Sequence, residues 1–258
     1  MPKFAANLSM LFGEHDFINR FAAAAKAGFA SVEYLSPYAF PKEQVAEALH
    51  ANKLKQVLFN LPSGNWEGGE RGIGCLPNRV GEFQDGVGKA IDYAKALDCT
   101  MINCLAGIIP QTVARDKAFA TMAANLAFAA VALKKEGILL IVEPINRFDI
   151  PGFLLNTSAD GITMIDAAAT DNLKLQYDIY HMQRMEGELA ATMTRLLPRI
   201  GHIQLADNPG RNEPGTGEIN YPFLFRHLDG LGYKGWIGCE YKPKSGTDAG
   251  LGWMKHLG

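Results

Sequence analysis

The sequence predicts a single-domain (β/α)₈ barrel, or TIM barrel, that spans residues 1–258. Three observations predict it. Eight short apolar runs of the kind that form buried parallel strands recur along the chain. A segment whose apolar residues have helical spacing follows each run, which is the alternation of parallel β/α architecture. The length of 258 residues also fits one closed barrel, which typically needs about 250 residues.

The first half of the chain contains four of these units and one long loop. Strands are expected at residues 3–8, 31–35, 55–61 and 101–105, and helices at 16–27, 42–52, 82–97 and 114–136. Phe17 and Phe21 share one face of the first helix, and Gly28 follows it as a C-terminal cap. Pro41 stands where a helix start tolerates proline. Residues 62–79 are rich in Gly, Pro and Trp, and long loops of this kind are usually lids or binding loops.

The second half repeats the alternation around the run 138–142, which ends in Glu143 and Pro144. Strands are expected at residues 138–142, 173–177, 200–205 and 235–239, and helices at 158–168, 188–197, 221–231 and 247–256. Proline cannot donate to a strand ladder, so the central strand must stop at Glu143. No Gly-x-Gly-x-x-Gly motif follows the first strand, which leaves a dinucleotide site without support.

Composition excludes several classes of partner. The formal net charge of −2 gives no electrostatic reason to expect nucleic acid or an anionic membrane surface. The four cysteines lack Cys-x-x-Cys spacing, as expected for reduced thiols in the cytoplasm. No signal peptide and no apolar run of about 18 residues is present. We therefore expect a soluble cytoplasmic protein that acts on a small molecule; a homo-oligomer is compatible with the sequence.

Four consecutive strands end in oxygen-bearing side chains. These are Glu143, Asp178, Gln204 and Glu240, and each follows the previous one by about the length of one β/α unit. Because the carboxyl ends of all strands meet at the catalytic face of a barrel, we expect the four side chains to converge there. The alternative is that each acid merely caps a helix or lies in a solvated turn.

Convergence of three carboxylates requires some form of charge relief. Two like charges 4 Å apart repel by about 4 kcal/mol at an effective dielectric of 20. Either the carboxyl groups take up protons, with raised pKa values, or the site holds a divalent cation. Four oxygen ligands, with no imidazole or thiolate among them, favour Mg²⁺ or Mn²⁺.

Further polar residues lie just beyond the same strand ends. Asp149 follows Glu143, His181 lies three residues after Asp178, Arg211 lies in the loop after Gln204, and Lys242 follows Glu240. His181 could also be an ordinary structural histidine.

Two other features receive weaker functional interpretations. His202 alternates with Gln204 along one strand and should point into the barrel, where it would be a core residue or would hold Gln204. Trp66, Glu70 and Arg71 in the long loop could form a lid or an anion clamp, or a solvated flap.

The strand-end residues and the loop 207–217, which contains Arg-Asn-Glu-Pro-Gly-Thr-Gly, resemble the xylose-isomerase-like barrel superfamily. Within it the chain resembles the hydroxypyruvate isomerase family, together with the related 2-oxotetronate isomerases, over essentially its whole length. The matching stretches are residues 4–12, 69–73, 177–189, 213–221 and 235–243.

This resemblance implies an isomerase of hydroxypyruvate and tartronate semialdehyde, with Glu143 and Glu240 as both proton carriers and metal ligands. It implies that His181, Arg211 and Asp149 contact substrate. Two positions depart from the pattern: many relatives have histidine at Gln204 and glutamate at Asp149. A 2-oxotetronate isomerase, or a related keto-sugar isomerase or epimerase, is the alternative of the same chemistry.

The substrate carboxylate needs a cation, for which Arg71, Arg211 and Lys242 are the candidates. Two other classes stay open on the sequence. A metal-dependent abasic-site endonuclease would need more histidine ligands and a basic DNA-binding face. A barrel that only binds a sugar acid would be expected to have lost the pair of glutamates.

Overall fold

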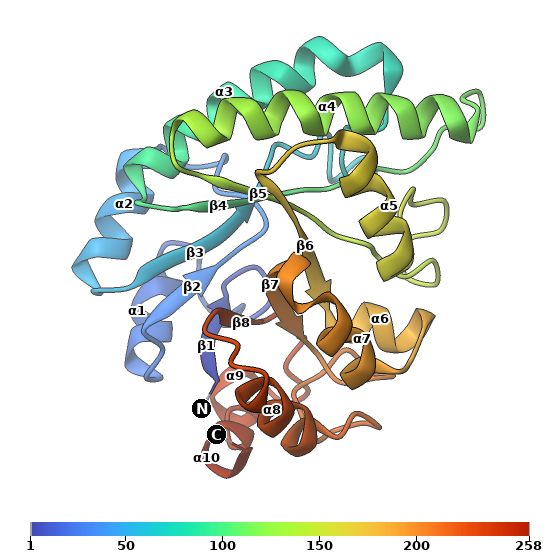
Figure 1. The fold of residues 1–258 in the computed structure, drawn as a ribbon. Coiled ribbons are helices and arrows are strands. Elements are labelled where there is room, and N and C mark those ends of the chain that lie inside the picture. The colour runs from blue at the N-terminus through green and yellow to red at the C-terminus, as the bar shows by residue number, and fades with distance from the viewer. Residues whose placement is uncertain (1, 258) are drawn as a thin grey trace.

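The structure, a computed structural model, describes residues 2–257 and shows a closed barrel of eight parallel strands (Figure 1). The strands pair in chain order, and β1 also pairs with β8, which closes the ring. The predicted (β/α)₈ barrel is therefore confirmed. The terminal residues 1 and 258 of the predicted domain lie outside the described part of the chain.

All eight predicted strands are present. They are β1 (Lys3–Asn7), β2 (Ser31–Glu33), β3 (Lys55–Asn60), β4 (Met101–Cys104), β5 (Leu139–Val142), β6 (Leu173–Asp178), β7 (Ile200–Leu205) and β8 (Trp236–Cys239). The second strand is shorter than the predicted 31–35. Its pairing with β3 shifts register between Val32 and Glu33, and the strand ends at Glu33.

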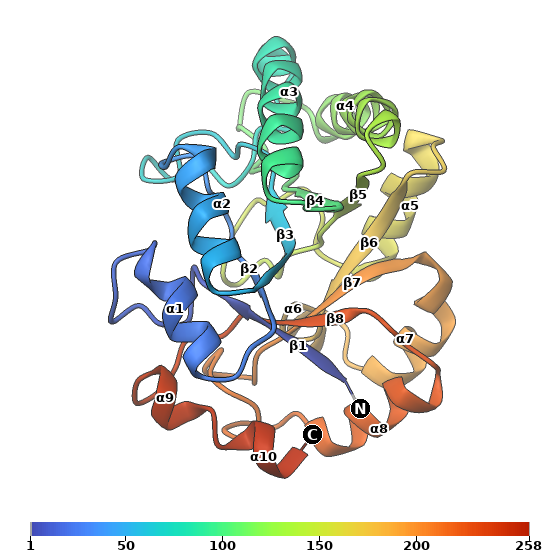
Figure 2. The same cartoon turned by 90° about the vertical axis from the view of Figure 1, so that its left-hand side faces the viewer.

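Helices surround the barrel on the outside (Figure 2). They are α1 (Asn19–Lys26), α2 (Lys42–Ala51), α3 (Val80–Ala96), α4 (Arg115–Lys135), α5 (Ser158–Ala168), α6 (Ile179–Met185), α7 (Leu189–Leu196), α8 (Tyr221–Gly230), α9 (Thr247–Gly250) and α10 (Trp253–Leu257), with 3₁₀ turns η1 (Pro77–Arg79) and η2 (Leu197–Arg199).

The helix prediction was wrong in two places. Helix α6 was not predicted; it begins directly after β6 because the Asp178 side chain accepts the backbone N–H groups of Tyr180 and His181 as an N-cap. The continuous helix predicted over 247–256 is two short helices, α9 and α10, with a break at Leu251 and Gly252.

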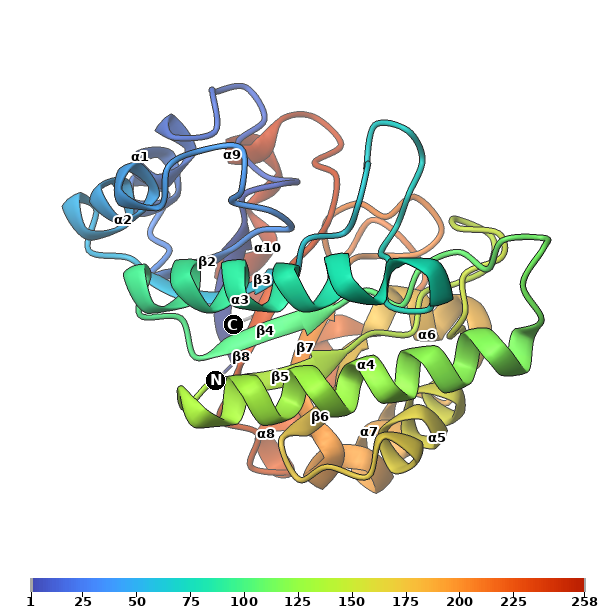
Figure 3. The same ribbon diagram turned by 90° about the horizontal axis from the view of Figure 1, so that it is seen from above.

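Helix α4 is long and apolar enough to cross a membrane by length and composition alone. In the structure it lies beside α3 along the outside of the sheet (Figure 3) and buries Met122, Leu126 and Leu133 against the barrel. These contacts account for its apolar composition as that of a barrel helix.

The barrel interior is apolar near the beginnings of the strands and polar towards their carboxyl ends. Ala5, Leu58 and Ile141 form a small cluster that packs against residues at the beginnings of strands, such as Trp236. Towards the carboxyl ends the interior holds buried polar side chains, among them Glu33. Polar groups inside a barrel must be paired or used, so the functional site is to be sought at that end.

Candidate active site

A cavity of about 410 Å³ opens at the carboxyl ends of the strands. It is lined by Glu143 and Glu240 and by all five side chains predicted to contact substrate, namely Arg71, Asp149, His181, Arg211 and Lys242. Asp178 and Gln204 do not line the cavity and are buried, at 0% and 2% exposed. The barrel has thus brought residues from distant parts of the chain to one cavity.

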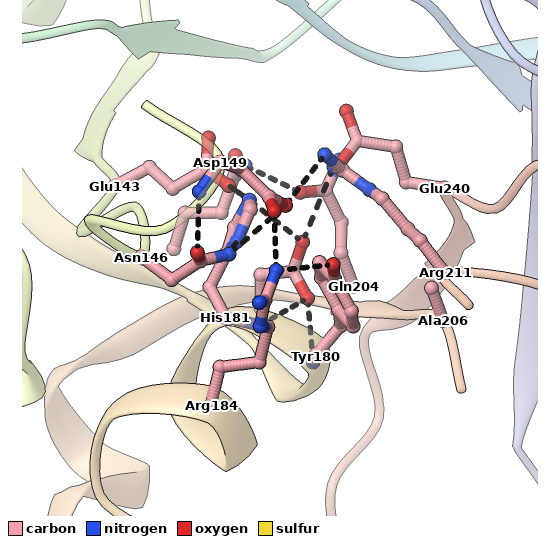
Figure 4. Close-up of polar contacts among 12 residues, drawn as sticks. Glu143, Asn146, Asp149, Tyr180, His181, Arg184, Gln204, Ala206, Arg211 and Glu240 are labelled. Atoms are coloured by element: carbon pink, nitrogen blue, oxygen red, sulfur yellow. Dashed lines mark hydrogen bonds and ion pairs between the residues drawn. The ribbon is translucent and has the colours of Figure 1, made fainter. Parts of the chain in front are cut away.

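Three carboxylates and one imidazole lie close together at this end of the barrel, and Figure 4 shows Glu143, His181 and Glu240 among them. Glu143, Asp178, Glu240 and His181, here called the carboxylate cluster, are all buried, and their possible metal-binding atoms lie within 4.8 Å of one another. The three acids were predicted to be metal ligands, whereas His181 was predicted to contact the substrate.

Burial dominates the protonation of the acids in the carboxylate cluster. It raises the pKa of Glu143 well above its ordinary value, and repulsion from Glu240 and Asp178 raises it further. Burial also raises the pKa of Asp178, and it raises that of Glu240 to about 8, although the Arg211 guanidinium opposes both shifts. A protonated carboxyl near neutral pH is suited to proton transfer.

Arg211 is the cation closest to these acids. It donates a hydrogen bond of 2.6 Å to Glu240 and lies 3.9 Å from Asp178. Its loop is organised by Asp207, whose carboxylate accepts backbone N–H groups of Gly215, Gly217 and others at 2.9–3.1 Å. This role of Asp207 was not predicted, although an acid followed by a Gly- and Pro-rich loop is a signal for it.

His181, on helix α6, is held by a side chain from the loop after β5. Its Nδ1 lies 2.7 Å from the amide nitrogen of Asn146, and its Nε2 lies 3.6 Å from Asp178 and 3.9 Å from Glu143. Burial, followed by repulsion from Arg211 and Arg184, lowers the pKa of His181 well below its ordinary value. The imidazole is therefore neutral around pH 7 in the metal-free protein.

Gln204 is bonded at both ends of its amide. Its oxygen accepts a hydrogen bond from Gln176 at 2.5 Å, and its nitrogen donates to Glu33 at 2.7 Å. The bond from Gln176 leaves the oxygen with a second lone pair. The contact with Glu33 was not predicted; its signal in the sequence is an acid inside the otherwise apolar second strand. Nε2 of His202 lies 2.7 Å from Oε2 of Glu33, so His202 is a buried core residue, one of the two roles expected for it.

The remaining predicted contacts lie at the rim of the cavity. Asp149 forms an ion pair with Arg184 and accepts a hydrogen bond from Asn146. The guanidinium of Arg71 lies over the Trp66 ring, 4.2 Å from its centre, and donates to two carbonyl groups of its own loop. The Lys242 backbone N–H donates to the Arg211 carbonyl at 2.8 Å.

The cluster has the chemistry of a metal site. Oδ2 of Asp178 is buried and has no hydrogen-bond partner within residues 2–257, which is costly unless another ligand occupies it. Three carboxylates that repel one another would gain from a divalent cation, and carboxylate oxygens suit a hard one. The residues present therefore fit a bound metal ion.

The comparisons with known proteins agree with this geometry. A model of the family described as "Xylose isomerase-like TIM barrel" matches residues 21–257. The chain belongs to the xylose isomerase-like TIM barrel family. Within this family it is 55% identical to hydroxypyruvate isomerase of Escherichia coli (strain K12) over 254 residues, or 98% of each chain. The predicted family and the prediction of an isomerase are thus confirmed.

Two further relatives in the family bear on function. The chain is 48% identical to 2-oxo-tetronate isomerase of Cupriavidus necator, over 99% of this chain and 98% of the relative. It also resembles a crystal structure described as AP endonuclease, family 2, from Brucella melitensis. That structure has a TM-score of 0.97, 41% identity and 99% coverage of both chains. The family name alone therefore leaves the substrate to be argued from the site.

Proposed function

We propose that this protein interconverts hydroxypyruvate and 2-hydroxy-3-oxopropanoate (tartronate semialdehyde). The observation that carries the proposal is that two buried glutamates with raised pKa values, Glu143 and Glu240, line one cavity from the positions that follow β5 and β8. Moving a carbonyl by one carbon requires a proton to leave C3 and another to reach C2. A pair of carboxyl groups around one substrate is suited to that exchange.

The residues proposed to hold the metal, Mg²⁺ or Mn²⁺, are Glu143, Asp178, Gln204 and Glu240. When bound, such an ion supplies Lewis-acid stabilisation of the negative charge of an enediolate. The unpartnered Oδ2 of Asp178 and the free lone pair of Gln204 support this ligand set. Glu143 and Glu240 then each need one oxygen for the substrate proton.

Cations at the cavity account for an anionic substrate. Arg211 is half-buried beside Glu240 and would hold a substrate oxygen or carboxylate as well as the protein acid. Arg71 and Lys242 line the outer part of the same cavity, and we propose that the three bind the substrate carboxylate between them. Asp149 fixes Arg184 and accepts from Asn146, and we propose that it shapes the substrate end of the site.

Hydroxypyruvate and 2-oxotetronate undergo the same reaction and differ by one hydroxymethylene group. We place hydroxypyruvate first because 55% identity to a hydroxypyruvate isomerase exceeds 48% to a 2-oxo-tetronate isomerase. The test is steady-state turnover of both acids after chelation and after return of Mg²⁺ or Mn²⁺. We expect kcat/KM for hydroxypyruvate to be at least about tenfold higher, the usual lower limit for one methylene-sized group. Equal or reversed values would assign the four-carbon acid.

The endonuclease alternative is tested separately. The carboxylate cluster has a single histidine, and the chain's net charge is −2, so neither a histidine-rich multi-metal site nor a basic DNA face supports it. We propose a cytoplasmic enzyme of small molecules without nucleic-acid or membrane partners. Titration with abasic duplex DNA at low salt should show no binding; binding and cleavage there would replace the isomerase proposal.

A further inference from the structure

Asn146 is fully buried and makes hydrogen bonds with both ends of its amide. Its side-chain oxygen accepts the backbone N–H groups of Phe148, at 3.1 Å, and Asp149, at 2.9 Å. Asparagine side chains commonly close turns on their own backbone in this way. Because backbone N–H groups can only donate, the atom that faces them must be the amide oxygen. The local turn therefore fixes which way the amide points.

The amide nitrogen must then face His181. It lies 2.7 Å from Nδ1 of His181 and 3.0 Å from Oδ2 of Asp149, so each of its two hydrogens has one partner (Figure 4). An amide NH₂ can only donate in these contacts. Nδ1 of His181 is consequently the acceptor, and in the neutral imidazole the proton resides on Nε2.

The protonated nitrogen is the one that faces the carboxylate cluster. Nε2 of His181 lies 3.6 Å from Oδ2 of Asp178 and 3.9 Å from Oε1 of Glu143. A nitrogen that binds a metal needs a free lone pair, and metal-ligating histidines almost always donate their other N–H group to a carboxylate, a carbonyl or water. His181 has the reverse arrangement, because its other nitrogen accepts. Its position would suit a ligand, but its proton makes it a donor.

We propose that Asn146 is a positioning residue that holds His181 in its Nε2–H tautomer. His181 thereby donates a hydrogen bond to a substrate oxygen and stays outside the metal's ligand set. The inference deepens the proposed function and rests on it for the substrate. The tautomer itself follows from the contacts of Asn146 alone.

An exchange of the side chains at positions 146 and 149 tests this role. The double variant Asn146→Asp/Asp149→Asn keeps the net charge, keeps a hydrogen bond between the two positions and still provides an oxygen for the turn. It presents an acceptor to Nδ1 of His181 in place of a donor. The reference is Asp149→Asn alone, which leaves the contact between Asn146 and His181 in place.

The first measurement is the ¹⁵N spectrum of the histidine rings in the metal-free protein, with the His181 signal assigned by its loss in His181→Gln. We expect Nε2 to carry the proton in the wild type and in Asp149→Asn, and Nδ1 to carry it in the exchange variant. A wild-type protein with protonated Nδ1 would overturn the proposal, and this reading needs no variant at position 146. An unchanged tautomer in the exchange variant would overturn it equally.

The second measurement is the affinity for Zn²⁺ relative to Mg²⁺, by calorimetry at pH 8. In the exchange variant the freed lone pair of Nε2 joins the ligands, and imidazole favours Zn²⁺. We expect the affinity ratio to rise at least about tenfold over Asp149→Asn, which is the low end of such outer-shell effects. A purely structural role would change both affinities alike, so a constant ratio would refute the proposal.

Turnover separates this inference from the proposed function. We expect kcat for hydroxypyruvate to fall at least about tenfold in the exchange variant relative to Asp149→Asn, because a donor to developing charge is lost. If the wild type has the Nε2–H tautomer and the exchange variant shows the change in metal preference, but the wild type does not turn over hydroxypyruvate, the proposed function is refuted and the assignment of Asn146 is supported. If the wild type turns over hydroxypyruvate but has its proton on Nδ1, the proposed function is supported and the assignment of Asn146 is refuted.

Discussion

Buried acids occur in two places inside this barrel, and the two places differ in how the carboxylate oxygens are hydrogen-bonded. The first is the Glu33 group, which consists of Glu33 and its partners Asn7, His202 and Gln204. Each partner places a nitrogen 2.7–3.0 Å from the Glu33 carboxylate. Gly238 leaves room for it, since a Cβ there would lie only 2.2 Å from a Glu33 oxygen.

The second group is the carboxylate cluster at the barrel mouth. Asp178 has an oxygen with no hydrogen-bond partner among the described residues, and Glu143 accepts a long bond of 3.3 Å from Asn103. Both groups are equally buried, so burial does not distinguish them. The difference is that the Glu33 carboxylate is surrounded by donors from its own fold, whereas the cluster keeps lone pairs available for a ligand.

Pairing, and not burial, therefore separates an acid held by the fold from one whose oxygens are available to a ligand. A satisfied carboxylate contributes to the native state, because removal of its charge leaves donors unpaired. Acids that repel one another lower stability and persist because function requires them. The same substitution, Glu→Gln, should therefore have opposite effects in the two groups.

The largest effect is expected at the two glutamates of the cluster. Glu143→Gln and Glu240→Gln should each reduce kcat for hydroxypyruvate by at least about 10³-fold, because each removes a proton carrier and a metal ligand. The Tm of the metal-free variants should stay equal or rise, because repulsion is relieved. Near-normal turnover in either variant would refute the two-glutamate scheme.

The next largest effect is expected at Asp178, which is proposed as a metal ligand but not as a proton carrier. Asp178→Asn should weaken Mg²⁺ or Mn²⁺ binding about 10–100-fold, since an amide supplies a weaker ligand to a hard cation. Its amide still offers an oxygen to the N–H groups at the start of α6, so the helix should persist. Calorimetry with each metal checks this, and an unchanged affinity would remove Asp178 from the ligand set.

The Glu33 group should respond in stability. Glu33→Gln places an amide NH₂ among donors, which should cost about 1–3 kcal/mol and lower the Tm by about 2–10 °C. Exposed Glu47→Gln is the control and should change the Tm by less than about 1 °C. We expect kcat to change much less than in Glu143→Gln. A loss of turnover without a loss of Tm would place Glu33 in the functional group.

The pH dependence of the metal-free protein reports on the same contrast. Folding raises the pKa of Glu240 from 4.5 to about 8, so the folded state favours the protonated form. The stabilisation is fully present below about pH 4.5 and is lost as the pH rises through about 8. The Tm should fall between pH 5 and 8.5, by a few degrees, and less steeply in Glu240→Gln. A Tm that rises over this range would contradict the direction.

Chain order predicted that the candidate residues would lie close together, because a closed parallel barrel brings all strand ends to one face. Glu143 and Glu240 are far apart in sequence, yet each follows a recognisable apolar run. Closure of the barrel then brings the two residues close together. The contacts of Glu33 and Asn146 could not be predicted from the sequence. Glu33 and His202 are separated by 169 positions, and only side-chain contacts across the closed barrel reveal that pair.

Side chains that also accept backbone N–H groups were a further feature that the sequence did not predict. Metal binding and helix capping were treated as alternatives for Asp178, but its side chain begins α6 by accepting N–H groups of Tyr180 and His181, which places His181 at the cluster. Asp207 similarly organises the loop of Arg211 through backbone contacts. Apolar periodicity carries no signal for such side-chain-to-backbone bonds, since a single polar residue decides them.

The smallest effect is expected at the rim of the cavity, where the side chains belong neither to the Glu33 group nor to the carboxylate cluster. Trp66 is 40% exposed, lines the cavity and stacks on Arg71. Trp66→Ala removes a cation–π contact of about 0.5–1 kcal/mol, which corresponds to a rise in KM of about two- to fivefold with kcat unchanged. Phe223→Ala on α8, also an exposed aromatic, is the matched control and should leave KM as it is. If Trp66→Ala lowered kcat instead, the loop would act in the chemical step and the contrast would extend beyond the two buried groups.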